Sequence, residues 1–402
     1  MPSGTPAQRP GLPRIILLFM GVDWPLYMRR PAVAALADAA KERGSTLVAV
    51  NRPLCPLSTW FRKPGRIRDL FGRPRLERLT PNLYLYSPRY VIHDLVAARL
   101  PALHGLNLAA LRISYRHLQK RLGVAEAHPI VWFNAPEQGY VTRLLPNSFA
   151  VFELYDELSA VDGRQSPRTL RQEAALRTRV DLLLTTSQAL ESKYGPHYRQ
   201  SVMYGNGVSR DSFDRLGSDS VRPLETLLKI PSPRLGYAGM LSLRMDWSLI
   251  TRLAELEPAW HFVFVGPIAA MDIVQRCRKA ANIHFAGPVG QEAMPAVLRA
   301  FDLGLLPYRD TPFFHYLNPL KFYEMAAAGL PMVSSAIEEL RRFPETLVTL
   351  ADHNAEAWRE AIRDALSSNR SDVARVGREA VREFLWEDMA ERVLDRIARL
   401  IS

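Results

Sequence analysis

Short apolar runs alternate with longer segments in which apolar residues recur every three or four positions along most of this chain. Continuous apolar runs are typical of strands buried on both faces, and the longer segments are typical of helices, so the pattern predicts an α/β fold with parallel sheets. In the first half we predict helices at 29–43, 96–121 and 167–179, and strands at 14–21, 46–51, 83–88, 129–134, 149–156, 181–187 and 201–206.

The second half repeats this alternation after a polar segment with three prolines, residues 214–233, which we interpret as a linker. Here we predict helices at 246–256, 291–300 and 319–328, and strands at 234–240, 261–267, 283–288, 303–308, 331–335 and 347–351. The pattern therefore predicts a first domain at 1–213, a second domain at 234–380, and a C-terminal helix at 381–402. Two facing α/β domains form a cleft at the carboxyl ends of their strands, where ligands bind.

Composition narrows the class of protein. The 402 residues are 48% hydrophobic and 23% charged, which is typical of a globular chain. Cys55 and Cys277 are the only cysteines, so a disulfide framework is excluded and we expect the cytoplasm. The sequence contains no run of about 18 apolar residues, so it predicts no membrane span. The apolar run near the N-terminus is short and precedes Asp23, which favours a buried strand over a signal peptide.

The formal charge of +11 suggests that the protein binds anionic partners. Residues 61–78, "FRKPGRIRDLFGRPRLER", hold seven basic and two acidic residues with apolar residues between them. This segment is either a solvated loop or a loop that docks on an anionic membrane on its inner, cytoplasmic face. The segment 96–121 could also touch a membrane, although core packing is the simpler interpretation. Nucleic acid is disfavoured as a partner, because aromatic stacking residues are few.

Candidate chemistry is clearest in "NPLKFYEMAAAGLPMV", residues 318–333. Asn318 and Gly329 predict the N-cap and the C′ residue of a helix at 319–328. Lys321 then lies in the first turn, where the helix dipole disfavours a cation by about 0.3–1 kcal/mol unless an anion is bound. The motif therefore fits a phosphate site, with an ion pair between Lys321 and Glu324 on a solvated face as the alternative.

The neighbouring strands favour the phosphate interpretation. A predicted strand ends at 308, just upstream of this helix, and another begins at 331, just downstream. The helix N-terminus should therefore lie at the carboxyl edge of a parallel sheet, which is the edge that faces the cleft.

An ordered series of motifs resembles a known family. The series comprises "RLGYAGMLSLRMDWSLITRLAELEPAWHFVFVGP", "NIHFAGPVGQEAMPAVLRAFDLGLLPY" and "NPLKFYEMAAAGLPMVSS" in the second half, and "DLLLTTSQAL" and "YGNGVSRDSF" in the first. Together they resemble glycosyltransferases of the GT-B fold, which have two Rossmann-like domains, and among them the retaining family 4 (glycosyltransferase group 1). The resemblance also implies that the C-terminal helix crosses back to the first domain.

The resemblance implies a role for each matching residue. Lys321 and Arg244 would bind the donor diphosphate and act in catalysis, and Glu324 would accept hydrogen bonds from the ribose. The same site would include the closely approaching backbone of Gly239 and Gly266 and the helix N-terminus at Asn318, Leu320 and Lys321. The implied reaction transfers a sugar, with retention, from a UDP- or GDP-linked donor to a polysaccharide or lipid-linked acceptor. The donor is a substrate, and no cofactor or metal is expected.

The first domain should hold the acceptor. Asp23, Asn134, Asp156 and Glu157 follow predicted strands and are the acceptor-side candidates. Asp156 is the catalytic candidate among them, with helix capping as the alternative. Two histidines are further candidate bases, for which a structural role is favoured, namely His93 and His315.

One departure from the family pattern stands out. The family has two glutamates separated by seven residues; Glu324 matches the second, whereas Tyr316 takes the position of the first. The carboxylate that contacts the donor sugar is thus absent or comes from another residue such as Asp310. A nucleotide-sugar epimerase and a degenerate binding or assembly module therefore remain as alternatives.

Overall fold

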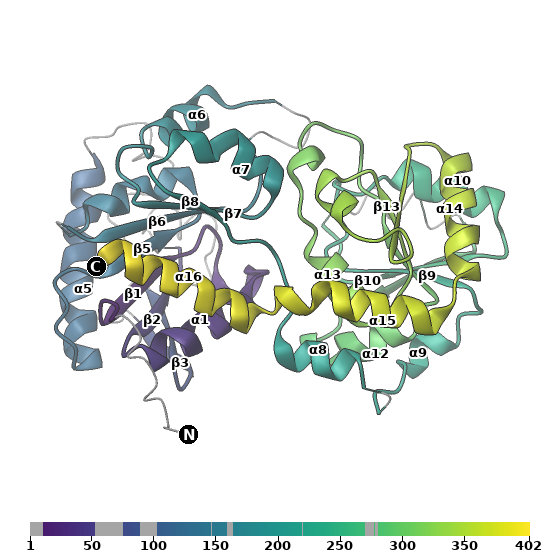
Figure 1. Ribbon diagram of the computed structural model, residues 1–402, viewed down its shortest axis with the longest axis horizontal. Coiled ribbons are helices and arrows are strands. Elements are labelled where there is room, and N and C mark those ends of the chain that lie inside the picture. Colours follow the sequence, from purple (N-terminus) through teal and green to yellow (C-terminus); the bar gives the residue numbers. More distant parts are fainter. Residues whose placement is uncertain are drawn as a thin grey trace, which may run out of the picture.

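The computed structural model describes residues 11–52, 75–88, 103–145, 147–158, 164–218, 220–269, 277 and 280–402. Within them the chain forms two α/β domains that lie side by side, each built on its own sheet (Figure 1). The fold class predicted from the sequence is confirmed.

The sheet of the first domain has the strand order β3-β4-β2-β1-β5-β6-β7-β8. Neighbouring strands are parallel except β3, which runs antiparallel to β4 and was not predicted. Its strands are β1 (Ile15–Phe19), β2 (Thr46–Val50), β3 (Arg75–Thr80), β4 (Leu83–Ser87), β5 (Ile130–Phe133), β6 (Phe149–Leu154), β7 (Leu182–Thr185) and β8 (Ser201–Met203).

Helices cover both faces of this sheet, because successive residues of each strand point to opposite sides. In β1, Ile16 and Leu18 pack towards α1 and α16, whereas Ile15, Leu17 and Phe19 pack towards α5, η4 and α7. The helices of this domain are η1 (Trp24–Leu26), α1 (Arg30–Glu42), α5 (His104–Leu122), η4 (Pro136–Arg143), α6 (Pro167–Ala174), α7 (Gln188–Tyr194) and η5 (Gly195–His197).

The sheet of the second domain is parallel throughout, with the order β11-β10-β9-β12-β13-β14. Almost every residue of its central strands is buried, as the apolar runs predicted. The strands are β9 (Arg234–Ala238), β10 (His261–Val265), β11 (Ile283–Gly287), β12 (Leu303–Leu306), β13 (Met332–Ser335) and β14 (Val348–Ala351).

The helices of the second domain share a single large apolar core with this sheet. α10 packs with α14, while α13 packs with α15 and α8. These helices are α8 (Arg210–Leu216), α9 (Glu225–Leu228), α10 (Trp247–Leu256), η6 (Gln291–Ala293), α12 (Met294–Arg299), η7 (Phe314–Tyr316), α13 (Leu320–Ala327), η8 (Glu338–Arg342), α14 (Ala355–Ser367) and α15 (Arg370–Val381).

The connection between the domains lies earlier than the predicted linker at 214–233. Leu216 and Leu227 of that segment are buried in the core of the second domain, and Ile230 packs against it. The chain passes from β8 to α8 between 204 and 209. The prolines and polar residues of 214–233 therefore mark a surface segment of the second domain.

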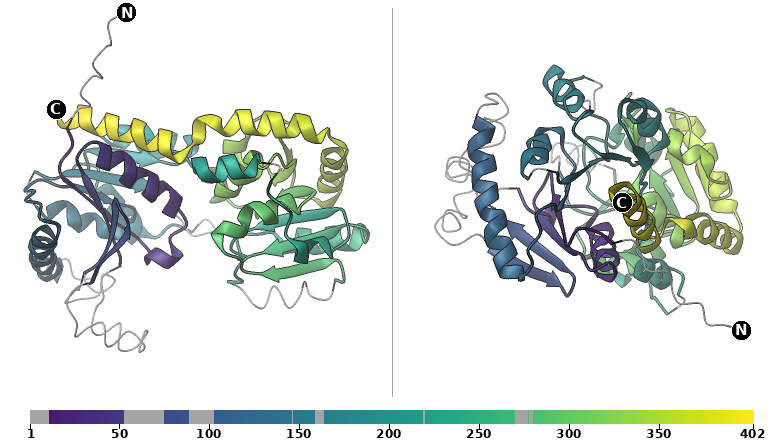
Figure 2. Two further views of the ribbon diagram at one scale, coloured as in Figure 1. Left: turned by 90° about the horizontal axis from the view of Figure 1, so that it is seen from below. Right: turned by 60° about the vertical axis from the view of Figure 1, so that its left-hand side comes forward.

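The C-terminal helix α16 (Trp386–Ile401) returns to the first domain and packs on α1, as the family resemblance implied (Figures 1 and 2). Trp386, Met389, Val393 and Ile397 form its buried face. The predicted C-terminal helix at 381–402 is not one helix, however. It breaks at η9 (Arg382–Phe384), where the Trp386 amide donates to the Val208 carbonyl, so the chain crosses between domains there.

In both sheets the strand order reverses at one point. β1 lies between β2 and β5, and β9 lies between β10 and β12, so the chain builds each sheet outwards from one of these strands, first on one side and then on the other. Ligands of open α/β sheets bind outside the carboxyl ends of the strands at such points. A ligand site is therefore expected at the segments that follow β1, β5, β9 and β12.

Residues 61–74 of the basic segment 61–78 lie outside the described residues. Residues 96–102 of the predicted helix 96–121 lie outside them as well. Among the helices that the structure describes, none is both long and apolar enough to cross a membrane.

Candidate active site

The helix α13 starts at the carboxyl edge of the second sheet, after β12. Its N-cap is Pro319, so Lys321 is the second helical residue, and the predicted N-cap role of Asn318 is wrong. Asn318 is 3% exposed, and its side chain donates instead to the carbonyl of Thr186 in the first domain, at 2.7 Å. Asn206 in turn donates to the Asn318 carbonyl at 2.7 Å. Asn318 therefore holds this helix end against the other domain.

The other end of α13 is closed as the sequence predicted. Gly329 adopts φ +68°, and its amide donates to the Ala326 carbonyl while the Leu330 amide donates to the Met325 carbonyl. This pair of bonds is a Schellman motif, which needs a left-handed residue that glycine supplies without strain. A side chain at Gly329 would also overlap Ala374 of α15. The close contact with α15 thereby fixes the position of α13 and of Lys321.

Lys321 does form the ion pair with Glu324, but not on a solvated face. The Nζ–Oε2 distance is 2.9 Å, and the two side chains are only 14% and 18% exposed. Burial opposes the charged form, yet the Glu324 carboxylate outweighs it and raises the pKa of Lys321. The lysine is therefore a persistent cation, held at the carboxyl edge of the sheet beside a helix N-terminus.

Two tyrosines at the point of strand reversal join this site, and the sequence reasoning missed both. Tyr237 lies in β9 and Tyr308 follows β12; both are buried and their hydroxyls are hydrogen-bonded to each other. Burial raises the pKa of each, and Lys321 lies close enough to Tyr237 to oppose that rise. Their signal in the sequence is a tyrosine near the end of an apolar run, in "RLGYAGM" and "LGLLPY".

Arg244 reaches the same place from the loop after β9. Its guanidinium lies 5.0 Å from the centre of the Phe313 ring. Its Nη2 also donates to Asp156 Oδ2 of the first domain at 3.2 Å. Burial raises the pKa of Asp156, and Arg244 opposes the rise. The structure thus brings together two of the three predicted catalytic residues, Arg244 and Asp156, from opposite domains in a partly exposed ion pair.

The predicted glycines approach each other across neighbouring loops. A Cβ at Gly266 would overlap the Gly239 carbonyl, and Gly266 has φ +143°, a conformation essentially restricted to glycine. A Cβ at Gly239 would come within 3.2 Å of Lys321 Cε. The two glycines therefore let the loops after β9 and β10 lie against the lysine.

Two polar candidates at the cleft edge of the first domain are hydrogen-bonded to other residues of that domain. Asn134 is buried; its Oδ1 accepts from the Gly21 amide at 2.7 Å and its amide donates to the Tyr27 hydroxyl at 3.2 Å. Glu157 is likewise buried and accepts from Lys193 and Tyr194 at 3.1 and 2.9 Å. These contacts make both residues parts of the scaffold rather than groups presented to a ligand. Asp23 is half-buried just before η1.

Tyr316, the departure from the family pattern, faces the first domain. Its ring lies 4.7 Å from Lys193 Nζ, and its carbonyl accepts from Ser187 at 2.8 Å. This position therefore serves the contact between domains. Asp310 and His315 are exposed, while His93 lies outside the described residues.

A small pocket joins the two domains at Lys321. It is lined by Met28, Arg29, Arg30 and Pro31 at the start of α1, by Gly207, Val208, Ser209 and Ser212 at the domain connection, and by Gln291, Leu320, Lys321, Glu324 and Trp386. The predicted residues Leu320, Lys321 and Glu324 thus face this pocket. Among the residues that the structure describes, no three His, Cys, Asp or Glu side chains group closely enough to hold a metal ion.

This architecture, two Rossmann-like domains with the site at their facing edges, is the GT-B fold. Solved structures share it along nearly the whole chain. Sucrose-phosphate synthase from Thermosynechococcus elongatus has a TM-score of 0.71 at 17% identity, covering 96% of this chain and 99% of that chain. The structure described as "Trehalose-6-phosphate from E. coli bound with UDP-2-fluoro glucose" has a TM-score of 0.68 at 13% identity, covering 95% and 99%. Anabaena HepE in complex with UDP and glucose has a TM-score of 0.65 at 13% identity, also covering 95% and 99%.

The sequence comparisons point to a particular family within this fold. Residues 232–368, in the second domain, match the model of the family described as "Glycosyl transferases group 1", in agreement with the motifs of that domain. A curated relative, the "Putative teichuronic acid biosynthesis glycosyltransferase TuaH" of Bacillus subtilis (strain 168), is 29% identical over 116 residues. That match covers 28% of this chain and 29% of the relative, so the chain matches less than a third of the relative's length.

Proposed function

We propose that this protein is a glycosyltransferase that moves a sugar from a nucleotide-sugar donor, UDP- or GDP-linked, to a polysaccharide or lipid-linked acceptor, with retention and without a required metal. The observation that carries the proposal is Lys321, a cation only 14% exposed, at the N-terminus of α13 on the cleft edge of the sheet. A cation next to a helix N-terminus is electrostatically unfavourable by itself and becomes favourable when an anion binds.

The donor would lie against the second domain. Its diphosphate would contact Lys321, the first amides of α13 and Arg244, and its ribose hydroxyls would donate to Glu324. Glu324 lines the same pocket as Lys321, which supports this role. UDP and UDP-2-fluoro glucose, which two solved proteins of the same fold carry, are ligands of the expected kind.

Catalysis would depend on charge stabilisation at the leaving diphosphate. Positive groups fixed in advance stabilise the charge that grows as the sugar leaves, and they do so without reorganisation. Lys321 and Arg244 have this role in the proposal. Asp156 holds Arg244 before the donor binds, and it lies at the first domain's edge, where the acceptor is expected.

The acceptor class rests on less direct support. The relative TuaH is described as acting in teichuronic acid biosynthesis, which suggests a polysaccharide. The helix α5 has no acidic residue, and its exposed side carries Leu106 and Ile113, about half exposed, beside Arg112, Arg116 and Lys120. Such a mixture of apolar and basic residues suits an anionic membrane surface, which supports peripheral attachment and a lipid-linked acceptor.

The test is donor binding and turnover in Lys321→Ala. We expect the rate of UDP or GDP release from the nucleotide sugar to fall about 10²–10³-fold, as for loss of one preorganised charge stabiliser. Lys229→Ala is the matched control, since Lys229 is an exposed lysine of the same domain that does not line the pocket. Calorimetry with UDP and GDP and a coupled assay of nucleotide release would measure both steps.

Three outcomes separate the alternatives. Nucleotide binding without release or transfer by the wild type would favour a degenerate binding module. Conversion of the nucleotide sugar to an epimer would identify an epimerase. Equal activity of Lys321→Ala and Lys229→Ala would refute the assigned role of Lys321.

A further inference from the structure

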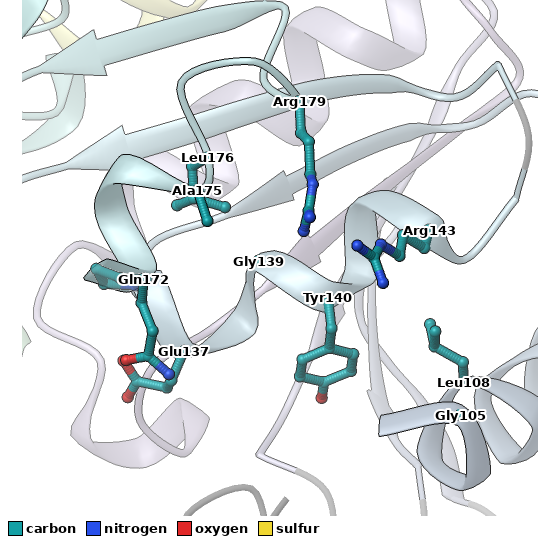
Figure 3. A pocket seen from close by; sticks show the side chains of 11 residues that line it. Gly105, Leu108, Glu137, Gly139, Tyr140, Arg143, Gln172, Ala175, Leu176 and Arg179 are labelled. Carbon is teal, nitrogen blue, oxygen red and sulfur yellow. The ribbon is translucent and has the colours of Figure 1, made fainter. Parts of the chain in front are cut away.

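A second pocket lies on the first domain, between the start of α5, η4 and α6 (Figure 3). It opens on the face of the sheet that α5, η4 and α7 cover, and it shares no lining residue with the pocket at Lys321. Gly139 lets η4 approach α6 closely, because a Cβ there would overlap Leu176. The pocket therefore has a floor of backbone and small side chains, with longer side chains around it.

Two arginines converge on this pocket. Arg143, at the end of η4, and Arg179, after α6, extend towards the same space in Figure 3. Burial and the charge of Arg143 lower the pKa of the Arg179 guanidinium, which shows that the two cations affect each other. Among the described residues neither forms an ion pair with a carboxylate. Two neighbouring guanidinium groups without a counter-charge are ready to share an anion.

A third arginine stiffens this end of the pocket. Arg112 of α5 donates from Nε to the Leu144 carbonyl at 2.8 Å and from Nη2 to the Arg143 carbonyl at 3.0 Å. It thereby holds the backbone that carries Arg143 and adds positive potential. The arginine cluster of Arg112, Arg143 and Arg179 comes from three separate segments, so only the tertiary fold brings it together.

The rest of the pocket lining carries no positive charge. Gln172 and Glu137 lie at the opposite end from Arg143 in Figure 3, while Leu108, Leu176 and Tyr140 supply apolar surface between. Amide and carboxylate oxygens accept hydrogen bonds from hydroxyls, and apolar or aromatic surface covers the C–H face of a sugar ring. A bare inorganic anion would use only the arginine end.

We propose that this pocket binds an acidic carbohydrate, with the carboxylate or phosphate of one sugar residue between Arg143 and Arg179 and its ring beside Tyr140 and Gln172. The site is separate from the donor site and does not depend on it. In a protein that extends an acidic glycan, it would hold the chain at a distance from the reacting end.

The experiment measures binding by calorimetry with four probes at one ionic strength: a glucuronate trisaccharide, glucose 6-phosphate, inorganic phosphate and a neutral glucose trisaccharide. We expect one or both acidic sugars to bind at least about tenfold more tightly than the neutral sugar and phosphate, because only they use both ends of the pocket. Comparing the trisaccharide with glucose 6-phosphate tells whether the anion is a carboxylate or a phosphate. Phosphate binding as tightly as both sugars, or no binding of either acidic sugar, would overturn the proposal.

Two double variants distinguish binding in the pocket from general electrostatic attraction to the protein. Arg143→Gln/Arg179→Gln should lose at least about tenfold in affinity for the acidic sugar. Arg116→Gln/Arg171→Gln is the matched control, which removes the same charge from exposed positions on α5 and α6 outside the pocket lining. Equal losses in the two double variants would show non-specific attraction and overturn the site. Thermal unfolding would verify that both double variants fold.

Donor binding is read out separately, so the two proposals can fail independently. Lys321→Ala should lose UDP binding and keep acidic-sugar binding. A wild type that binds the acidic sugar but no nucleotide would support the pocket and contradict the proposed function.

Discussion

The two edges that face the cleft hold polar residues in opposite ways. In the first domain, Asn134 and Glu157 are buried and hydrogen-bonded to the scaffold around them. In the second, Lys321 and Glu324 are bonded to each other and face a pocket, and the Arg244 guanidinium donates across the domain boundary to Asp156. Both edges looked equally polar in the sequence, yet among these candidate residues only Lys321 and Glu324, both of the second domain, line the pocket.

This difference shows that position after a strand is not enough to identify a binding residue. A buried polar side chain that is hydrogen-bonded to the scaffold and lines no pocket supports the fold, and its loss leaves other buried groups unpaired. A charged side chain at a pocket can exchange its present ion-pair partner for a bound ligand. Substitutions in the first domain should therefore act mainly on stability, and those in the second mainly on affinity.

The largest effect on stability is expected for Glu153→Gln in the first domain. Glu153 pairs with Arg29 at 2.8 Å, the two side chains are 4% and 6% exposed, and it also accepts from Trp132 at 2.8 Å. Removing one partner of a buried ion pair leaves an uncompensated charge, so we expect a loss of about 3–5 kcal/mol in the free energy of unfolding. Urea unfolding measures this loss.

Asp388→Asn provides the comparison for Glu153→Gln. It breaks the Arg210–Asp388 pair, whose side chains are about half exposed, and it should cost no more than about 1 kcal/mol. Similar losses in the two variants would contradict the distinction between a buried and an exposed pair.

Next in size is Gly266→Ala in the second domain. The strain of φ +143° and the overlap with Gly239 should cost about 1–3 kcal/mol and move the loop beside Lys321, so UDP affinity should fall as well. Thermal unfolding and UDP calorimetry test both effects. Gly44→Ala is the control, since Gly44 has φ +75° but open space around it. A Gly266→Ala variant with unchanged UDP affinity would separate this loop from the donor site.

The smallest effect is expected for Asp156→Asn, which releases Arg244 from its pair. A half-exposed pair is worth about 0.2–1 kcal/mol, so UDP affinity at pH 7 should rise by up to about fivefold. Calorimetry with UDP measures it, and Asp388→Asn again serves as the control. Weaker UDP binding in Asp156→Asn would mean that Asp156 assists the donor instead of competing with it.

The pH dependence of stability tests the same carboxyl group. Burial raises the folded pKa of Asp156 above its ordinary value of 3.8, so between the two values the folded state binds more protons than the unfolded state. The stability of the wild type relative to Asp156→Asn should therefore fall as the pH rises through that window. Unfolding curves between pH 4 and pH 7 would show it, and a constant difference would contradict it.

Much of the fold could be predicted, because apolar periodicity reports burial directly. The buried strands of both sheets lie within the predicted ranges, and Gly329 ends α13 as expected. The antiparallel strand β3 was missed, since its charged sequence "RLERLT" on the sheet edge lacks an apolar pattern. The predicted linker was displaced because prolines and polar residues mark a surface, and Leu216 and Leu227 anchor that surface to the second domain.

The candidate site could be predicted in part. Lys321 and Glu324 share a helix face, and helix geometry alone brings them together. The pairing of Arg244 with Asp156, and of Tyr237 with Tyr308, joins residues from separate segments, which no local pattern encodes. Asn318 shows the converse: its sequence context predicts a helix cap, but the neighbouring domain offers the Thr186 carbonyl and takes the side chain.

The sequence by itself therefore determined the alternation of strands and helices, the two-domain architecture and the lysine at a helix start, because each follows from spacing along a regular backbone. The tertiary structure decided which polar residues are already bonded to the scaffold and which face open space. It also brought Arg143 and Arg179 to one pocket, with Arg112 bonded to the backbone beside it. The physical reason is that hydrogen bonds and charges act over a few ångströms in space, whatever the separation along the chain.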